Sequence, residues 1–243
     1  MILLLAGTSE GREMAEGLEA KVVPFIASLA GATRAPGVQG EMWRTGGFGG
    51  AAGFEDFLEA NQISAVLDLT HPFADRITQR SAKICAERGV PFAQVLRAPW
   101  KPGPGDLWHQ VNSETECVDL IAAQEVVFLA TGRQTLDRFQ GLKCRAVYCR
   151  QIDPPTGPFP FERGQFVIGR PPFSEAEEIA LFKELEVDWL VVKNAGGDAS
   201  RSKLDAARKL GIRVAMINRP PEGSHKILST VEAAETWLDE VTG

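Results

Sequence analysis

Gly7-Thr8-Ser9 follows the first apolar run of the chain and precedes a stretch with helical periodicity. At such a turn the first amide groups of the helix have no partner within it, and the helix dipole adds partial positive charge. Glycine lets the backbone approach a phosphate closely, and the hydroxyl groups of Thr8 and Ser9 add donors. We therefore predict a dinucleotide site here. The G-x-G-x-x-G pattern is incomplete, so a plain turn capped by Thr8 or Ser9 is the alternative.

The segment after the expected second strand carries no acidic residue. In nicotinamide enzymes an acid at this position binds the adenosine ribose, whereas a basic residue accommodates the 2′-phosphate of NADPH. Here the segment offers the hydroxyl of Ser28 and the cation of Arg34, and Arg12 can reach the same corner. These residues favour NADPH over NADH. A solvated loop charge is the alternative for Arg34.

Two further segments are expected at the same carboxyl edge of the sheet. The glycines of Gly46-Gly47-Phe48-Gly49-Gly50 leave room for adenosine or pyrophosphate, although a flexible loop gives the same pattern. Thr70-His71-Pro72 follows the expected fourth strand, and Pro72 suits the first turn of the next helix. A histidine at this edge can donate a proton near neutral pH, which makes His71 the candidate catalytic residue. Orienting a ligand or capping the helix are its alternative roles.

Small residues and cations also end two strands expected in the second half of the chain. Thr131-Gly132-Arg133 follows one strand, Lys193-Asn194-Ala195-Gly196-Gly197 ends another, and Lys203 is a further cation. Ligands of open α/β sheets bind at such carboxyl ends. Any one of these charges could lie on the surface. A set of cations in an acidic chain suits a substrate rich in carboxylates, which arginine pairs in a bidentate manner.

Several other chemistries lack their residues. Tyr148 is the only tyrosine and position 152 is Ile152, so the Tyr-x-x-x-Lys pair of short-chain dehydrogenases is missing. The histidines and cysteines show no metal-ligand spacing, and we expect no metal. Neither the G-x-x-x-x-G-K-[ST] loop nor the G-x-S-x-G elbow occurs.

The elements that must position these residues alternate between strand and helix in the first half of the chain. Apolar runs and helical periodicity predict strands at 2–6, 21–27, 41–45, 65–69 and 92–96, and helices ending near 19, 60 and 88. Strands joined by such helices imply right-handed parallel crossovers, and hence an α/β fold with a doubly wound sheet.

Residues 98–105, APWKPGPG, are predicted to be a linker because their prolines and glycines cannot continue a helix or a central strand. This divides the chain into a first domain at 1–97 and a second at 106–243. In the second, strands are expected at 126–130, 144–149, 189–193 and 213–217. Spacing typical of capping boxes predicts helix starts at Ser113, Ser174 and Ser229.

The overall composition is that of a globular protein with a net charge of −6. Such a charge argues against a nucleic-acid surface, and no apolar run is long enough to span a bilayer. The scattered cysteines, without a CxxC pair, indicate reduced core thiols and a cytoplasmic protein. The oligomeric state stays open, and a monomer is compatible with the sequence.

Six segments taken in order resemble the precorrin-6A reductase family: LLLAGTSEGR, SLAGATR, GGFGG, DLTHPFA, ATGRQTL, and KNAGG followed by KLDAARKLGIRVAMINRP. The resemblance covers about residues 1–240, and THPFA, GGFGG and KNAGG are its most specific parts. It implies reduction of one macrocycle double bond of precorrin-6A by hydride transfer from NADPH, giving precorrin-6B in cobalamin biosynthesis. It also implies two Rossmann-like domains with a cleft for the nucleotide and the tetrapyrrole.

The resemblance also assigns roles to individual residues. The nucleotide contacts that it implies are Gly7, Thr8 and Ser9 for the pyrophosphate, Ser28, Gly31 and Arg34 for the 2′-phosphate, Gly47, Phe48 and Gly49 for the ribose or adenine, and Thr70, His71 and Pro72 for the nicotinamide. The residues that it implies for the acidic arms of the tetrapyrrole are Arg133, Lys193, Asn194, Gly196, Gly197 and Lys203. It identifies no single catalytic acid, because water can supply the proton.

Three alternatives stay open from the sequence. The substrate could be the cobalt-containing analogue of the anaerobic pathway, or another polycarboxylate. A non-catalytic protein that binds NADPH and switches a partner would carry the same nucleotide turn. Turnover of a substrate distinguishes the enzymes from the sensor.

Overall fold

The computed structural model describes residues 1–30, 43–198 and 200–243. The chain divides into two compact units. The first unit comprises Met1–Ala98 and Pro220–Gly243, and the second unit comprises Pro99–Arg219. Each unit is built on a six-stranded sheet in which every pairing is parallel.

The first unit has its strands in the order β12-β5-β4-β1-β2-β3. Its strands are β1 (Ile2–Ala6), β2 (Phe25–Leu29), β3 (Trp43–Thr45), β4 (Ala65–Asp68), β5 (Phe92–Val95) and β12 (Lys226–Leu228). Its helices are α1 (Ser9–Ala20), α2 (Gly50–Ala60), α3 (Asp75–Arg88) and α7 (Val231–Thr242). The central strands are buried on both faces, which explains why β1 reads as one continuous apolar run.

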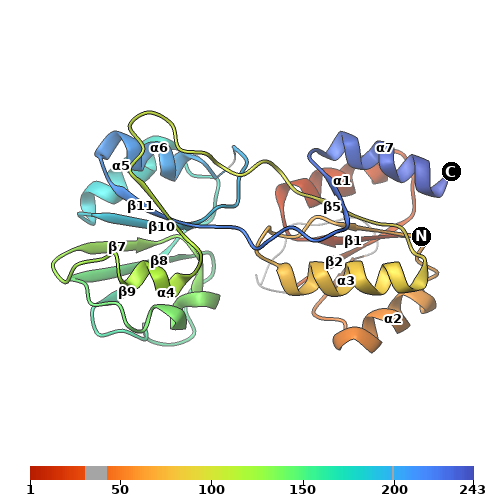
Figure 1. Ribbon diagram of the computed structural model, residues 1–243, viewed down its shortest axis with the longest axis horizontal. Coiled ribbons are helices and arrows are strands. Elements are labelled where there is room, and N and C mark those ends of the chain that lie inside the picture. The colour runs from red at the N-terminus through yellow and green to blue at the C-terminus, as the bar shows by residue number, and fades with distance from the viewer. Residues whose placement is uncertain (31–42, 199) are drawn as a thin grey trace. The chain divides into compact units, whose positions relative to one another are not determined.

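Helices cover both faces of this first sheet (Figure 1). On one face Met14 of α1 and Trp237 of α7 pack with Leu4 and Leu67 of the central strands. On the other face the helices α2 and α3 pack against alternate residues of the same strands. The sheet is therefore a buried middle layer, and the free places for a ligand are the loops at its carboxyl edge.

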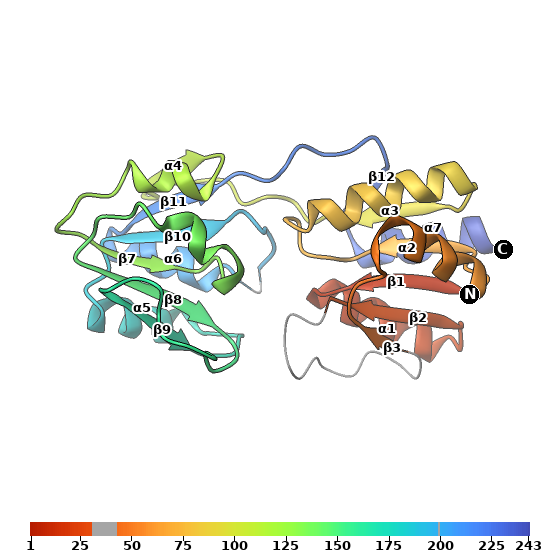
Figure 2. The same ribbon diagram turned by 90° about the horizontal axis from the view of Figure 1, so that it is seen from below.

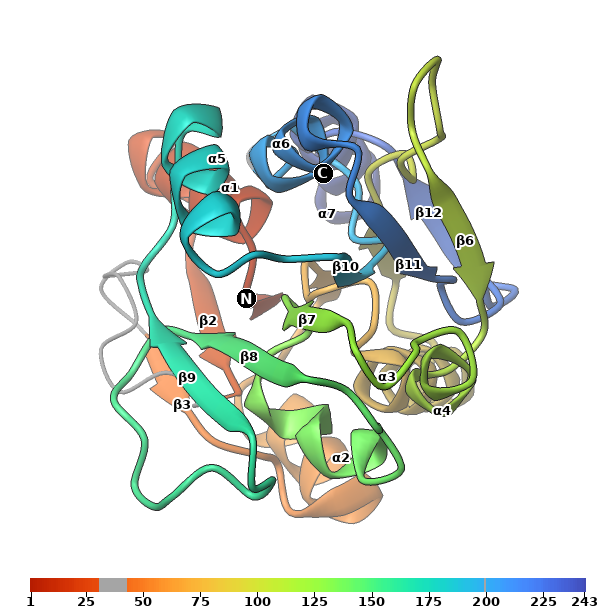
Figure 3. The same cartoon turned by 90° about the vertical axis from the view of Figure 1, so that its left-hand side faces the viewer.

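The second unit repeats this plan, with its strands in the order β6-β11-β10-β7-β8-β9 (Figure 3). Its strands are β6 (Trp108–Val111), β7 (Val126–Leu129), β8 (Ala146–Gln151), β9 (Gly164–Ile168), β10 (Trp189–Lys193) and β11 (Arg213–Ile217). Its helices are α4 (Glu114–Val118), the 3₁₀ helix η1 (Arg133–Phe139), α5 (Glu175–Glu184) and α6 (Ser202–Leu210). Phe182 of α5 and Leu204 of α6 bury one face of the sheet together with Phe128 of β7.

Each sheet has the 3-2-1-4-5-6 strand order of a dinucleotide-binding fold, but the sixth strand does not follow the fifth along the chain. In the first sheet it is β12, which comes after the whole second unit, and in the second sheet it is β6, which comes before the other strands of that sheet. The strand that follows β5 along the chain, β6, lies at the edge of the second sheet next to β11. The last strand of the chain, β12, returns to the first sheet and pairs with β5. The α/β fold with two parallel sheets is as predicted, but this exchange of edge strands is not.

The C-terminal segment therefore lies in a different unit from the one expected. The predicted second domain included residues 220–243, whereas the structure places them in the first unit. The chain returns to the first unit at β12 (Figure 2), where Leu228 pairs with Val95 of β5, and α7 packs beside α1 (Figure 1). The apolar side chains of α7 are buried in the core of the first unit. Because these contacts join residues far apart in the chain, no local sequence pattern predicts in which unit α7 lies.

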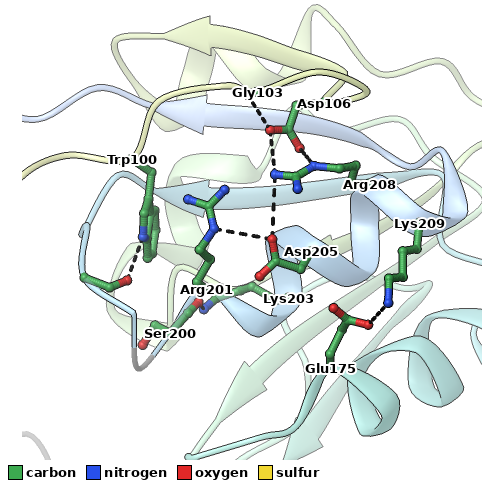
Figure 4. Close-up of polar contacts among 11 residues, drawn as sticks. Trp100, Gly103, Asp106, Glu175, Ser200, Arg201, Lys203, Asp205, Arg208 and Lys209 are labelled. Atoms are coloured by element: carbon green, nitrogen blue, oxygen red, sulfur yellow. Dashed lines mark hydrogen bonds and ion pairs between the residues drawn. The ribbon is translucent and has the colours of Figure 1, made fainter.

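The segment predicted as the inter-domain linker, residues 98–105, begins at the boundary between the two units, which falls between Ala98 and Pro99. Trp100 is buried, and its indole Nε1 donates to the carbonyl of Gly197. The Asp106 carboxylate accepts from the Gly103 amide and binds the guanidinium of Arg208 on α6 through two hydrogen bonds (Figure 4). The prolines and glycines of this segment shape a loop that is packed on the second unit.

Several elements differ in their bounds from the prediction. The expected helix from Ser113 to about residue 123 ends at Val118. Strands β6, β9 and β12 were not expected, because short edge strands with exposed residues lack an apolar run. The last helix is capped by Thr230, whose side chain accepts from the Ala233 amide, and not by Ser229.

Candidate functional site

The predicted phosphate turn joins β1 to α1 in the first unit. Thr8 is the N-cap of α1: its Oγ1 accepts from the Gly11 amide at 3.3 Å and donates to the Leu69 carbonyl at 2.8 Å. The capping alternative is thus confirmed for Thr8, and the same hydroxyl ties the turn to the loop after β4. Gly7 is exposed, and no atom lies within 4 Å of the place where a Cβ would stand. Open space over a helix start suits the close approach of a phosphate.

Gly11 has a packing role that the sequence analysis missed. A Cβ at this position would lie 3.3 Å from the Cβ of Ala6 and 3.5 Å from that of Leu69. Glycine therefore allows α1 to pack closely on β1 and on the loop after β4. In the G-x-G-x-x-G fingerprint the last glycine also allows the helix to pack closely on the strand. Counted from Gly7, that glycine would stand at position 12, one residue after Gly11.

The charge of Glu10 at this turn is compensated within the first unit. Arg97 Nη1 donates to both carboxylate oxygens of Glu10 at 2.7 Å. Burial opposes the charge of this carboxyl, but the hydrogen bond from Arg97 outweighs it and lowers the pKa of Glu10. Glu10 is therefore ionised at neutral pH and paired, which limits its repulsion of a phosphate. Arg12, on the same helix, is exposed.

The loop after β4 lies against the phosphate turn through the bond from Thr8 to Leu69. Thr70 Oγ1 is buried and has no hydrogen-bond partner among the described residues. His71 is exposed, and its Nδ1 accepts from the Phe73 amide at 3.2 Å, which places the proton of a neutral ring on Nε2. Pro72 does not lie in the first turn of α3, because that helix begins at Asp75.

Arg44 is a residue that the sequence analysis missed. The parallel pairing of β2 with β3 sets Arg44 opposite Ser28. Its Nη1 donates to Ser28 Oγ at 2.8 Å, its Nη2 donates to the Gly47 carbonyl at 2.8 Å, and its guanidinium lies 4.1 Å from the centre of the Phe48 ring. A fixed cation thus occupies the corner at which Arg34 was expected to act. Arg34 and Gly31 lie outside the described residues.

The glycine-rich loop needs glycine for its backbone. Gly46 and Gly49 have φ angles of 104° and 80°, a region that other residues rarely adopt, and a Cβ on either would meet no atom within 4 Å. Gly47 and Gly49 are exposed, whereas the Phe48 ring packs edge-on against Phe54 of α2. The loop therefore presents an open backbone surface beside Arg44.

At the carboxyl edge of the second sheet, buried polar atoms gather without partners. Among the described residues none bonds to Thr131 Oγ1, Thr135 Oγ1 or the side-chain amide of Gln151. Thr131 follows β7, Thr135 lies on η1, and Gln151 ends the neighbouring strand β8. Arg133, between the two threonines, is exposed. Buried polar groups are normally bonded, so this edge is suited to a polar ligand.

Lys193 ends β10 beside an acidic partner. Its Nζ lies 3.6 Å from a carboxylate oxygen of Glu114, which also pairs with Arg138 at 3.0 Å. Burial lowers the pKa of Lys193, and the charge of Glu114 opposes that shift. The Glu114 carboxylate thus pairs with both Arg138 and Lys193. Its negative charge weakens the attraction of Lys193 for an acidic substrate.

Asn194 serves the fold of the second unit directly. It is buried, its Oδ1 accepts from the Trp100 amide at 2.8 Å, and its Nδ2 donates to the Trp100 carbonyl at 3.0 Å. Arg219 Nε donates to the Asn194 carbonyl at 2.8 Å. Gly196 and Gly197 follow with φ angles of 68° and 76°. The predicted substrate contact of the Asn194 side chain therefore competes with its bonds to Trp100.

Lys203 is the most perturbed cation of the second unit. Its Nζ donates to the Ser200 carbonyl and lies 5.6 Å from the centre of the Trp100 ring (Figure 4). Burial lowers the pKa of Lys203 to about 8, with the charge of Glu178 opposing the shift. Lysines with such values change charge close to physiological pH.

The described residues contain no group of three or more histidine, cysteine, aspartate or glutamate side chains that could hold a metal ion. No helix among them is both long and apolar enough to cross a membrane. The four cysteines are unpaired.

The sequence profile of the family described as "Precorrin-6x reductase CbiJ/CobK" matches residues 1–239. The chain belongs to this family. The resemblance seen in the sequence is thereby confirmed, and the chain is a reductase of a kind that uses a nicotinamide cofactor.

Members of the precorrin-6x reductase family resemble the chain over nearly its whole length. A precorrin-6A reductase of Rhodococcus erythropolis is 38% identical, covering 99% of this chain and 98% of that protein. A cobalt-precorrin-6A reductase of Priestia megaterium is 27% identical, covering 96% and 95%. A solved structure described as CobK precorrin-6A reductase shares 36% identity with a TM-score of 0.92, covering 98% of this chain and 96% of that one. This fold is therefore that of the precorrin-6x reductases.

Proposed function

We propose that this chain reduces precorrin-6A to precorrin-6B, with NADPH as the hydride donor, in cobalamin biosynthesis. The observation that carries the proposal is the difference in similarity between two kinds of relative. Precorrin-6A reductases are 37% and 38% identical to the chain, whereas the cobalt-precorrin-6A reductases are 26% and 27% identical. This difference favours the metal-free macrocycle. The four unpaired cysteines are consistent with a reducing cytoplasm.

The first unit is the proposed nucleotide-binding unit. The helix start at Gly7 and Ser9 receives the pyrophosphate, and the open backbone at Gly47 and Gly49 receives the adenosine. Arg44, held by Ser28, supplies the cation for the 2′-phosphate, with Arg12 nearby on α1. Each group matches a feature of the structure: open space over Gly7, exposed glycines and a fixed guanidinium.

The loop after β4 is the proposed nicotinamide contact. Thr70 Oγ1 is a buried hydroxyl without a partner among the described residues, and a bound carboxamide would satisfy it. The bound dihydronicotinamide supplies a hydride to one carbon of the macrocycle, and one proton completes the reduction of the double bond. His71 is the candidate donor of that proton in its imidazolium form; as a neutral ring, its Nε2 donates only a hydrogen bond to the macrocycle. Thr70, His71 and Pro72 otherwise act by position.

The second unit is proposed to bind the acidic arms of the tetrapyrrole. Arg133 is an exposed cation beside the unpartnered hydroxyls of Thr131 and Thr135, a combination that suits a carboxylate. Lys203 adds a second cation. The amides of Gly196 and Gly197, in their left-handed conformation, are further donors. Lys193 and Asn194 contribute mainly by holding this edge in place.

Turnover of the purified chain tests the proposal. With precorrin-6A and NADPH we expect loss of the NADPH absorbance together with formation of precorrin-6B. Binding of NADPH without consumption of any tetrapyrrole would indicate a sensor and refute the proposal. Faster turnover of cobalt-precorrin-6A would instead assign the chain to the anaerobic route.

Arg44→Ala tests the choice of NADPH. Loss of a charge-assisted contact to the 2′-phosphate should weaken NADPH binding roughly 10- to 100-fold, because such bonds contribute about 1.5–3 kcal/mol. NADH, which has no 2′-phosphate, should weaken only through the lost bond from Arg44 to the Gly47 carbonyl, and so by much less than NADPH. The dissociation constants of both nucleotides are the measurement. Arg88→Ala, a surface arginine of α3, is the matched control, and equal weakening of NADPH and NADH by Arg44→Ala would refute the assignment.

A further inference from the structure

The loop after β4 is held at two consecutive residues. The Leu69 carbonyl accepts from Thr8 Oγ1 of the phosphate turn at 2.8 Å. The Thr70 amide donates to Oδ1 of Asp68 at 2.9 Å. One anchor joins the loop to the start of α1, and the other joins it to the carboxyl end of β4. The backbone that follows, at His71 and Pro72, is positioned by this pair.

Asp68 makes a second strong bond, to helix α3. Its Oδ2 accepts from Thr78 Oγ1 at 2.5 Å, and both residues are buried, with Asp68 at 0% and Thr78 at 4% exposure. Asp68 thus connects β4, the loop and α3 through a single side chain. Gln94 is its neighbour on β5 and contacts the ring of His225.

Burying the carboxyl group of Asp68 at the end of β4 costs free energy. Burial raises the pKa of Asp68, although the hydrogen bonds from Thr78 and Thr70 and the charge of His225 oppose the shift. Among the described residues the hydrogen bonds to the Asp68 carboxyl come from neutral donors, the Thr70 amide and the Thr78 hydroxyl. These neutral donors do most to offset the cost of burying the carboxyl group. A residue needed only to fill the core would be apolar at less cost. What the carboxyl group adds is a fixed place for the Thr70 amide.

We propose that Asp68, oriented by Thr78, is a positioning residue for the reduction, and that it acts by fixing the Thr70 backbone against which the nicotinamide end of the dinucleotide lies. This proposal rests on the proposed function for the identity of the nucleotide. The phosphates and the adenosine contact other residues, at Gly7, Ser9 and Arg44. Asp68 therefore acts on the placement of the reacting ring and not on the overall affinity for the nucleotide.

Small errors of placement are costly in hydride transfer. A displacement of about 1 Å between reacting groups can slow a reaction by about 100-fold. Loosening the Asp68 anchor should therefore lower kcat while leaving the KM for NADPH nearly unchanged. A residue that only stabilises the unit would lower stability without separating these two constants.

Thr78→Val is the variant that tests the role. It keeps the shape of the side chain but removes the donor to Asp68 Oδ2. We expect kcat to fall at least about tenfold, with the KM for NADPH changed less than about threefold. Thr78→Ser restores the hydroxyl and should restore most of kcat. Ser81→Ala is the matched control, because Ser81 is buried one turn further along α3 and no described residue bonds to its hydroxyl.

A second readout does not depend on turnover. The fluorescence of bound NADPH reports the surroundings of its nicotinamide ring, and Thr78→Val should change this emission while the dissociation constant stays within about threefold. Unchanged emission and unchanged kcat would overturn the proposal, and so would a parallel loss of kcat and affinity. If the wild-type chain binds NADPH but does not reduce precorrin-6A, the proposed function fails, and the emission change still decides the role of Asp68.

Discussion

Lys203 combines a buried ammonium group with a position in the unit proposed to bind acidic arms. Burial lowers its pKa to about 8, so the side chain loses its charge at a pH at which ordinary lysines keep theirs. The KM for the tetrapyrrole should therefore rise as the pH increases above about 8. Lys203→Arg should abolish this rise, because arginine stays charged. Steady-state kinetics between neutral pH and pH 9.5 is the measurement.

The same group gives a test that is independent of the substrate. Between pH 8 and the ordinary lysine value of 10.5 the Lys203 side chain binds its proton more fully in the unfolded chain than in the folded chain, so its contribution to the free energy of unfolding rises with pH. Relative to Lys203→Met, the wild-type chain should therefore gain stability across this window. Urea denaturation at both ends provides the comparison. Lys209→Met, a change at an exposed lysine of the same helix, should leave the curve parallel to that of the wild type.

For single residues, the sequence predicts roles that depend on neighbouring positions in the chain. It does not predict roles that depend on a contact with a residue far away in the sequence. Thr8 follows from its place between an apolar run and a helix. The role of Arg44 depends on the parallel register that sets it opposite Ser28, and no local pattern reports that register. Asn194 was expected to face a substrate because it follows a strand, but its amide binds Trp100, far away in sequence.

The loop after β10 shows what such a long-range contact contributes to an element. Asn194→Ala would leave the buried amide and carbonyl of Trp100 without partners, at about 1–3 kcal/mol each. We expect the free energy of unfolding of the second unit to fall by about 2–4 kcal/mol. Asn218→Ala is the matched control, because Asn218 follows the next strand, β11, and its side-chain amide donates to Asn112 at the surface. A loss of less than about 1 kcal/mol in Asn194→Ala would contradict this account.

Strands that are buried in the middle of a sheet could be predicted from the sequence, whereas several strands at the edge of a sheet could not. Strands β1, β4, β7 and β10 lie within a few residues of their predicted places, because burial on both faces requires a continuous apolar run. The edge strand β9 has exposed residues and no such run. The segment at 98–105 contains no helix or strand, as its prolines and glycines predict, but that composition does not reveal the packing of Trp100.

For the whole molecule, the exchange of β6 and β12 makes the first unit dependent on the end of the chain. Trp237 and Leu238 of α7 belong to its core, and β12 completes its sheet. A chain that ends at Arg219 should therefore lose NADPH binding and expose apolar surface. The fragment Pro99–Arg219 contains every strand of its own sheet and should unfold cooperatively by itself. Nucleotide titration and urea denaturation of the two fragments are the measurements, and normal NADPH binding by residues 1–219 would refute the dependence.

The exchanged strands also set the order in which the chain matures during synthesis. A ribosome releases β1 before the second unit, yet the sheet that contains β1 stays incomplete until β12 and α7 have emerged after the second unit. The second unit, begun later, has all of its strands available earlier. Of the two units, the one that is begun earlier is thus completed later, and its open edge at β5 must remain unpaired while the second unit folds.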